Sequence, residues 1–189
     1  YTKQFKKGEI DAATVLNSVA SKIEAVSALH GALHKSADGK VVPLDDYLED
    51  LVRYIRDSLP ERISIDLQTL DAEVTSQMAG AVGIIVSEFV ANSVKHGFPD
   101  DREGRITIEV RGSGDDMVIR CADNGIGESD DWSGHKDAAD RQSRNSGLGT
   151  KIVESAASRI GAAISRSSSS EGYVLELTIP AHRRTAISA

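Results

Sequence analysis

Three polar side chains recur every fourth residue in EFVANSVKHG, residues 88–97, a segment whose apolar positions predict a buried helix. They are Glu88, Asn92 and His96, and positions four apart share one face of a helix. The amide oxygen of Asn92 is a hard ligand suited to Mg²⁺, whose other ligands are normally waters and phosphate oxygens. Glu88 can orient a water or accept a proton, and Lys95 and His96 can face phosphate oxygens. Taken singly, each residue also fits a half-exposed helix edge whose polar groups are satisfied.

The second candidate is DNGIG, residues 123–127, directly after the apolar run MVIRCA. An aspartate at a strand end can aim its carboxylate at a ring amino group. Gly125 and Gly127 permit positive φ angles and a close approach of backbone to ligand. Asp-Asn-Gly is also a strong turn signal, so a plain turn explains the same residues. The motif alone leaves both interpretations open.

The third candidate is NSGLGTK, residues 145–151, at the start of a predicted helix. Free N–H groups at a helix start, near the positive end of the helix dipole, form a seat for phosphate. The relevant residues are Gly147, Leu148, Gly149 and Thr150. A flexible junction between loop and helix explains the glycines equally well.

Apolar spacing predicts the elements that must position these groups. In chain order they are a strand, a helix, a hairpin, a helix and a second hairpin, at residues 62–68, 75–96, 104–125, 147–161 and 162–180. Residues 127–146 are polar without periodicity, which is typical of a functional lid or a disordered loop. One mixed sheet with helices on one face is the economical packing, so we predict an α/β two-layer sandwich.

Two further helices are predicted before this unit. Residues 11–34 carry a heptad stripe suited to packing on partner helices, and a turn follows at residues 35–40. A helix starts after Pro43, because proline and acids suit a first helical turn. We therefore expect a sandwich preceded by a dimerisation helix.

Composition narrows the class of protein. The chain has 189 residues, room for one domain and an appendage, and a net charge of −7 that argues against a nucleic-acid surface. Its single cysteine, Cys121, excludes an intramolecular disulfide and fits a reducing cytoplasm. No apolar run is long enough for a membrane span. The first residue, Tyr1, is not methionine, so we expect a piece of a longer protein whose missing segments can hold a membrane anchor or sensor.

The conjunction of the motifs carries a resemblance. Glu-x₃-Asn-x₂-Lys-His, then Asp-x-Gly-x-Gly, a polar lid and Gly-x-Gly opening a helix resemble the N, G1 and G2 boxes of the GHKL (Bergerat-fold) ATPase superfamily. Within it the chain is most similar to bacterial sensor histidine kinases of the HisKA_2/HWE type, through ALHGALHKS, ANSVKHGFPD and SGLGTKIVESAASRIGA. Trp132 is followed by Ser133 and Gly134 rather than the HWE signature, which favours the HisKA_2 side.

The resemblance implies a domain plan and a function. Residues 1–38 would be the second helix of a dimerisation and histidine-phosphotransfer hairpin whose first helix is missing, residues 43–182 the ATP-binding catalytic domain, and residues 183–189 a tail. The implied activity is an ATP-dependent protein histidine kinase of a two-component phosphorelay, a cytoplasmic, homodimeric transferase acting with a response regulator and without nucleic acid. The alternatives are a serine kinase of the anti-sigma-factor type, which is not expected to carry the heptad helix, and a phosphotransfer or scaffold protein that has lost ATP use.

The resemblance also implies roles for single residues. Asn92 would coordinate Mg²⁺, Glu88 would poise the attacking group, and Lys95 and His96 would meet phosphates. Asp123 would accept a hydrogen bond from the adenine amino group, with Gly125 and Gly127 giving the base room. Gly147 and Gly149 would hinge the lid, and N–H groups from Leu148 to Thr150 would cup phosphate. Candidate lid cations are Lys136, Arg141 and Arg144.

Two features depart from the pattern of these kinases. The chain contains no phosphoacceptor histidine box, because His30 and His34 lie in LHGALH, where that box is not expected. The phosphoacceptor would then belong to a missing helix or to another molecule. Val174 falls where relatives often carry a threonine near the adenine, so an auxiliary contact is expected to be lost.

Overall fold

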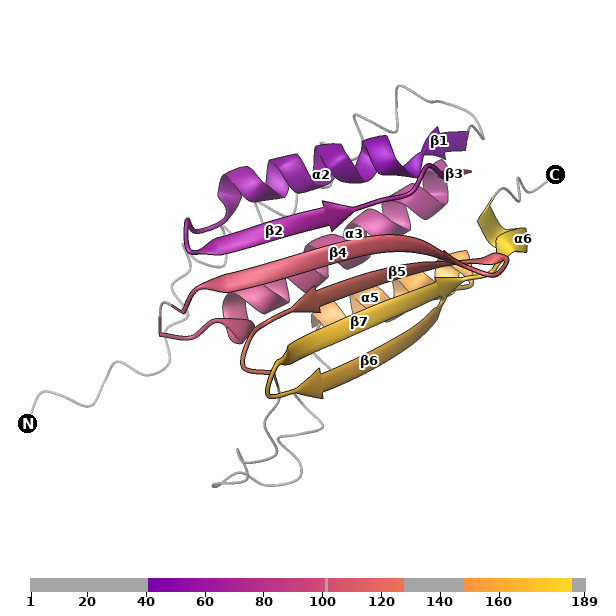
Figure 1. Cartoon of the computed structure of the whole chain (residues 1–189). Helices are drawn as coiled ribbons and strands as arrows, with labels where there is room; N and C mark the ends of the chain where they lie inside the picture. Colours follow the sequence, from indigo (N-terminus) through magenta and orange to yellow (C-terminus); the bar gives the residue numbers. More distant parts are fainter. Residues whose placement is uncertain (1–40, 101, 128–147, 185–189) are drawn as a thin grey trace, which may run out of the picture.

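Five strands form one mixed sheet in the computed structural model, which describes residues 41–100, 102–127 and 148–184 (Figure 1). In sheet order they are β2 (Ile63–Gln68), β4 (Gly104–Ser113), β5 (Asp116–Asp123), β7 (Gly172–Ile179) and β6 (Ala163–Ser169). Strand β2 runs parallel to β4, and the other neighbours are antiparallel. The two predicted hairpins are therefore confirmed, and they lie side by side through β5 and β7.

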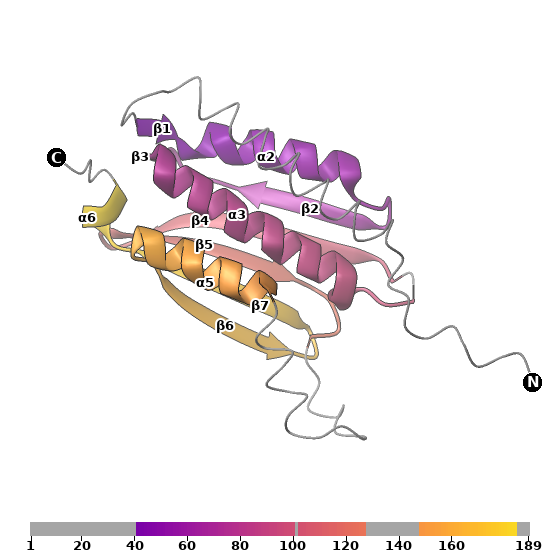
Figure 2. The same ribbon diagram turned by 180° about the vertical axis from the view of Figure 1, so that it is seen from behind.

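Three long helices cover one face of this sheet and leave the other open (Figure 2). They are α2 (Leu44–Ser58), α3 (Ser76–Asn92) and α5 (Leu148–Ile160). A short helix, α6 (Ala181–Arg184), follows the last strand. This arrangement confirms the predicted α/β two-layer sandwich. The residues predicted as the heptad helix and its turn, 11–34 and 35–40, and the predicted lid, 128–146, lie outside the described residues.

Alternation along the strands separates the core from the open face. The buried positions are Ile63 and Ile65 of β2 and Ile106 and Ile108 of β4. The alternate residues Ser64 and Asp66 of β2 are exposed. On the open face Arg111 pairs with Glu176 across strands, at 3.1 Å between Nη2 and Oε2. The core is aliphatic, as the scarcity of aromatic residues predicts.

Helix α3 runs through the middle of the domain. Thr75 caps its start, because the Thr75 hydroxyl oxygen accepts a hydrogen bond from the Met78 N–H at 3.2 Å. Contrary to the expectation that no apolar run is long enough, Ser76–Gly97 could cross a membrane by length and composition, but 61% of its apolar 18-residue window is buried inside the domain. Its apolarity is that of a core helix packed between the sheet and its neighbours.

Two local features differ from the predicted elements. The last turn of the predicted helix is a π-helix, η1 (Ser93–Gly97), a wider turn that is frequent at functional sites. The short strands β1 (Val41–Pro43) and β3 (Glu73–Thr75) form an antiparallel pair that the sequence did not predict. They tie the start of α2 to the start of α3, at the end of the domain opposite η1 (Figure 1).

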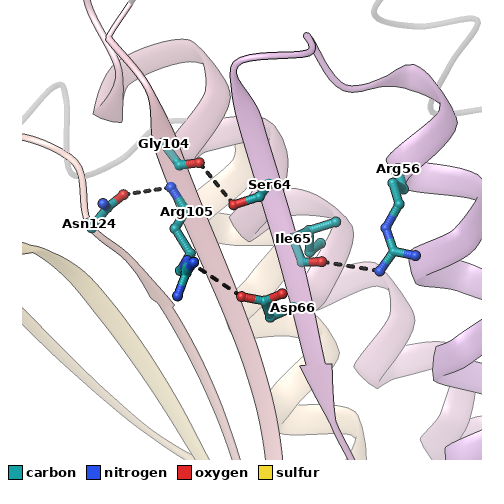
Figure 3. Close-up of polar contacts among 7 residues, drawn as sticks. All are labelled: Arg56, Ser64, Ile65, Asp66, Gly104, Arg105 and Asn124. Atoms are coloured by element: carbon teal, nitrogen blue, oxygen red, sulfur yellow. Dashed lines mark hydrogen bonds and ion pairs between the residues drawn. The ribbon is translucent and has the colours of Figure 1, made fainter.

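Polar side chains contact the edge strand β2 and its neighbour β4 (Figure 3). The Arg56 guanidinium on α2 donates a hydrogen bond to the Ile65 carbonyl oxygen at 3.1 Å. On the next strand the Arg105 side chain reaches Asp66, with 3.6 Å between Nε and Oδ2. The backbone N–H of Arg105 in turn donates to Asn124 Oδ1 at 2.6 Å, which connects this edge to the turn after β5.

Candidate functional site

Four segments that are distant in the sequence meet at one end of the sandwich. They are η1, the turn after β5 at residues 123–127, the start of α5, and the connection between β6 and β7. The three chemical motifs of the sequence therefore lie together in space. Hydrogen bonds and close backbone contacts hold them there.

Asp123 is the buried acid of this site. It ends β5, is 8% exposed, and accepts three hydrogen bonds from the described residues. Its Oδ1 accepts from the N–H groups of Gly125 at 2.9 Å and Tyr173 at 3.2 Å, and its Oδ2 accepts from the Ser93 hydroxyl at 2.6 Å. These donors compensate the carboxylate for its loss of water and fix its orientation.

The glycines of the same turn allow backbones to approach closely. A Cβ atom on Gly125 would lie 2.6 Å from the Gly97 carbonyl oxygen and 2.7 Å from Gly97 Cα. The same carbonyl oxygen accepts a hydrogen bond from the Ile126 N–H at 3.0 Å. Gly127 has a φ angle of +59°, and a Cβ there would collide with the carbonyl oxygen of Ser169. The turn is thus clamped between the end of η1 and the β6–β7 connection.

The start of α5 contacts the polar stripe of α3. A Cβ atom on Gly149 would lie 2.8 Å from Glu88 Oε2 and 3.7 Å from Asn92 Nδ2. Glu88 is buried at 7% exposure, whereas Asn92 is exposed. The first and third motifs are therefore in direct contact, and a side chain at position 149 would have to displace the acid.

The remaining predicted residues are placed as follows. Lys95 and His96 are exposed on η1, and a Cβ on the next residue, Gly97, would lie 3.6 Å from Asp123 Oδ1. Leu148 begins α5 and Thr150 is half-buried in its first turn. Gly147 and the candidate lid cations Lys136, Arg141 and Arg144 lie outside the described residues.

Ser93 and Tyr173 contact Asp123 but were not predicted as site residues. The only signal for Ser93 was a polar residue beside Asn92. Tyr173 contributes a backbone N–H, which no side-chain pattern reveals, and its ring stacks on Phe89 with centroids 6.1 Å apart. Val174, expected to mark a lost contact, pairs with Ala122 one residue further along β7.

Glu88 Oε2 and Asn92 Nδ2 lie 2.8 and 3.7 Å from the Cβ position of Gly149 at the start of α5. A carboxylate and an amide carbonyl oxygen are ligand types that Mg²⁺ takes together with waters and phosphate oxygens. Within residues 41–100, 102–127 and 148–184 no group of three or more His, Cys, Asp or Glu side chains could hold a metal by itself. A surface hollow of about 600 Å³ between α2 and strands β2 and β4 contains none of these motif residues.

Two family models match the chain. The model described as histidine kinase-, DNA gyrase B-, and HSP90-like ATPase matches residues 79–183, and a model described as histidine kinase matches residues 2–59. The first covers more than half of the chain and contains all three motifs from Glu88 onward. The second covers the predicted dimerisation helix, which the serine-kinase alternative was not expected to carry.

Two curated relatives align with half of the chain or more. The chain is 24% identical over 185 residues to blue-light-activated histidine kinase 2 of Erythrobacter litoralis, covering 92% of this chain and 49% of the relative. It is 31% identical over 120 residues to a gliding motility regulatory protein of Myxococcus xanthus, covering 55% of this chain and 15% of the relative. The chain thus spans about half or less of the length of these relatives.

Among solved structures, the histidine kinase domain of an Erythrobacter litoralis blue-light activated kinase has a TM-score of 0.73 at 22% identity, covering 94% of this chain and 86% of that one. Histidine kinase AdeS of Acinetobacter baumannii has a TM-score of 0.59 at 15% identity, covering 93% of this chain and 86% of that one. These similarities show a shared fold. With the fold, the motif geometry and the family match in agreement, the chain belongs to the histidine kinase-, DNA gyrase B-, and HSP90-like ATPase family, in which it is a catalytic module of the histidine kinase type.

Proposed function

We propose that this module binds ATP with Mg²⁺ and transfers the γ-phosphoryl group to a histidine. One observation carries the proposal. Asp123, which is held by three hydrogen bonds, lies at the same end of the domain as the Glu88–Asn92 stripe and the start of α5. Family membership implies ATP binding, and the HisKA_2 match supports histidine as the acceptor.

The base end of the site would be organised by Asp123. Its Oδ2 accepts one hydrogen bond from the described residues and so keeps acceptor capacity for the adenine amino group. Side chains at Gly125 and Gly127 would collide with neighbouring backbone. Because both residues are glycines, the backbone there could approach a planar base closely. The pairing is one of a buried carboxylate with a neutral donor, a charge-assisted hydrogen bond.

The phosphate end would be organised by α3, η1 and α5. The N–H groups of Leu148, Gly149 and Thr150 at the helix start would cup a phosphate oxygen. Lys95 and His96 would supply further donors, and Gly147 would hinge the lid. Asn92 would be the protein ligand of Mg²⁺, and the metal would neutralise charge on the β- and γ-phosphates.

The proposed transfer is a displacement at phosphorus. An imidazole nitrogen of the acceptor histidine forms a bond to the γ-phosphorus, and the bond from that phosphorus to the bridging oxygen breaks, releasing ADP. Glu88, buried beside Gly149, would orient the attacking imidazole by accepting its proton. Most of the acceleration would come from positioning and charge stabilisation.

The wider organisation is part of the same proposal. Residues 1–38 would form the second helix of a dimerisation hairpin, residues 43–182 the catalytic domain and residues 183–189 a tail. The module would work as a homodimer in the cytoplasm and pass its phosphoryl group to a response regulator. The acceptor histidine would come from a segment outside this chain or from another molecule.

Calorimetric titration with ATP, with and without Mg²⁺, tests the binding step. Asp123→Asn should weaken ATP binding about tenfold to hundredfold, because it replaces a charged hydrogen-bond acceptor. Asp66→Asn is the matched control, since Asp66 is an exposed carboxylate on the open face, 3.6 Å from Arg105. Absence of ATP binding by the unaltered chain would refute the proposal. If protein incubated with γ-labelled ATP acquires a label that is stable to acid, the module is instead the serine kinase.

A further inference from the structure

Ser93 carries a buried hydroxyl at the junction of α3 and η1. It is 4% exposed and is the first residue of η1, directly after Asn92. Its backbone N–H is shared between the carbonyl oxygens of Phe89 and Val90, as in an ordinary helical turn. Successive residues of a helix point about 100° apart, so the Ser93 side chain leaves the stripe of Glu88 and Asn92, and its hydroxyl donates a hydrogen bond to Asp123 Oδ2 at 2.6 Å.

Counting the acceptor positions of Asp123 shows what this hydroxyl does. A carboxylate offers about four lone-pair positions, two on each oxygen. The N–H groups of Gly125 and Tyr173 use Oδ1, and the Ser93 hydroxyl uses one position on Oδ2. One position therefore remains, on Oδ2, and only a donor can occupy it favourably.

We propose that Ser93 is a positioning residue that sets the base specificity of the site, an inference that rests on the proposed ATP binding. By holding Oδ2, its hydroxyl limits Asp123 to one open acceptor position of fixed direction. A base that presents an exocyclic amino group there is bound. A base that presents a carbonyl oxygen places two acceptors against each other, and the pinned carboxylate has no freedom to turn away.

Removing the hydroxyl removes the restraint on Oδ2 and not the carboxylate itself. The two N–H donors on Oδ1 remain, so Asp123 stays at the site but can rotate or admit a water beside a base carbonyl. Ser93 thus differs from Asp123 in its expected effect. Loss of Asp123 weakens adenine binding. Loss of Ser93 reduces the difference in affinity between bases with an amino group and bases with a carbonyl oxygen at that position.

The test compares ATP with inosine triphosphate, in which the amino group is replaced by a carbonyl oxygen. In Ser93→Ala the ratio of the dissociation constant for inosine triphosphate to that for ATP should fall about tenfold, because the released carboxylate can turn away from the base carbonyl. Ser93→Cys fills the site with a slightly larger group that is only a weak donor, so it should give the same trend without a cavity. Ser87→Ala on the neighbouring helix is the control, since the Ser87 hydroxyl has no hydrogen-bond partner among the described residues.

Equal loss of affinity for both nucleotides in Ser93→Ala and Ser93→Cys would overturn the inference, because it would reveal general damage. Unchanged discrimination in both variants would overturn it as well. Failure of the unaltered chain to bind ATP would remove the proposed function itself. A chain that prefers ATP but whose Ser93 variants keep that preference would leave the function standing and refute only the role of Ser93.

Discussion

Gly125→Ala isolates the close approach between the turn after β5 and the end of η1. The added Cβ would lie 2.6 Å from the Gly97 carbonyl oxygen, 2.7 Å from Gly97 Cα and 2.9 Å from Asp123 Oδ1. Two of these atoms belong to the backbone and cannot rotate away. The turn must therefore move away from η1, and it moves the carboxylate of Asp123 with it.

The expected magnitude follows from this clash. Inserting a methyl group into packed surroundings typically costs about 1–3 kcal/mol, and the lower chain entropy of unfolded alanine returns about 0.4–1 kcal/mol. A net loss of about 1–2 kcal/mol lowers the melting temperature by about 2–8 °C for a domain of this size. Displacement of Asp123 should also weaken ATP binding about tenfold.

The assay pairs thermal unfolding with nucleotide titration, and Gly112→Ala is the matched control. Gly112 lies in β4, and a Cβ there meets nothing within 4 Å. Gly112→Ala should leave the melting temperature unchanged or raise it slightly. If the two variants melt together and bind ATP equally well, the close approach at Gly125 does not organise the site.

Two further predictions concern the framework of the site. Thr75→Ala should lower the free energy of unfolding by about 1 kcal/mol, because the Met78 N–H at the start of α3 loses its acceptor. Chemical denaturation measures this free energy, and an unchanged midpoint would contradict the cap. Burial raises the pKa of the Cys121 thiol to about 12, with nearby Arg120 acting in the opposite, smaller direction. Cys121 should therefore resist alkylation at pH 8 while the domain is folded and react after unfolding, as followed by mass spectrometry, and rapid labelling of the native chain would contradict its burial.

The sequence predicted the parts of the fold that carry repeated patterns. Alternation marked the strands, and the spacing of Leu44, Tyr47, Leu48 and their successors marked α2, because each pattern is repeated over two turns or more. The β1–β3 pair escaped because strands of three residues carry too little alternation to distinguish them from loop. The widened turn at η1 escaped because no composition separates it from the end of an α-helix.

The same distinction holds for the site. Asp123, Gly125 and Gly149 belong to spaced motifs, so the sequence could nominate them before their contacts were known. The Ser93–Asp123 hydrogen bond joins residues 30 positions apart and depends on the tertiary placement of the end of β5 beside the end of α3. The Tyr173 contact uses a backbone N–H, which every residue except proline possesses.

The guanidinium of Arg56, which reaches from α2 to the outermost strand β2, affects how copies of this domain meet. A sheet border with vacant amides and carbonyls invites strands from other molecules and starts aggregation. Here the Ile63 N–H is bonded to the Pro60 carbonyl oxygen, and Arg56 occupies the Ile65 carbonyl oxygen at 3.1 Å. Two of the groups on which a foreign strand would build are already taken, which disfavours pairing of two such domains edge to edge along β2 and leaves dimerisation to other surfaces.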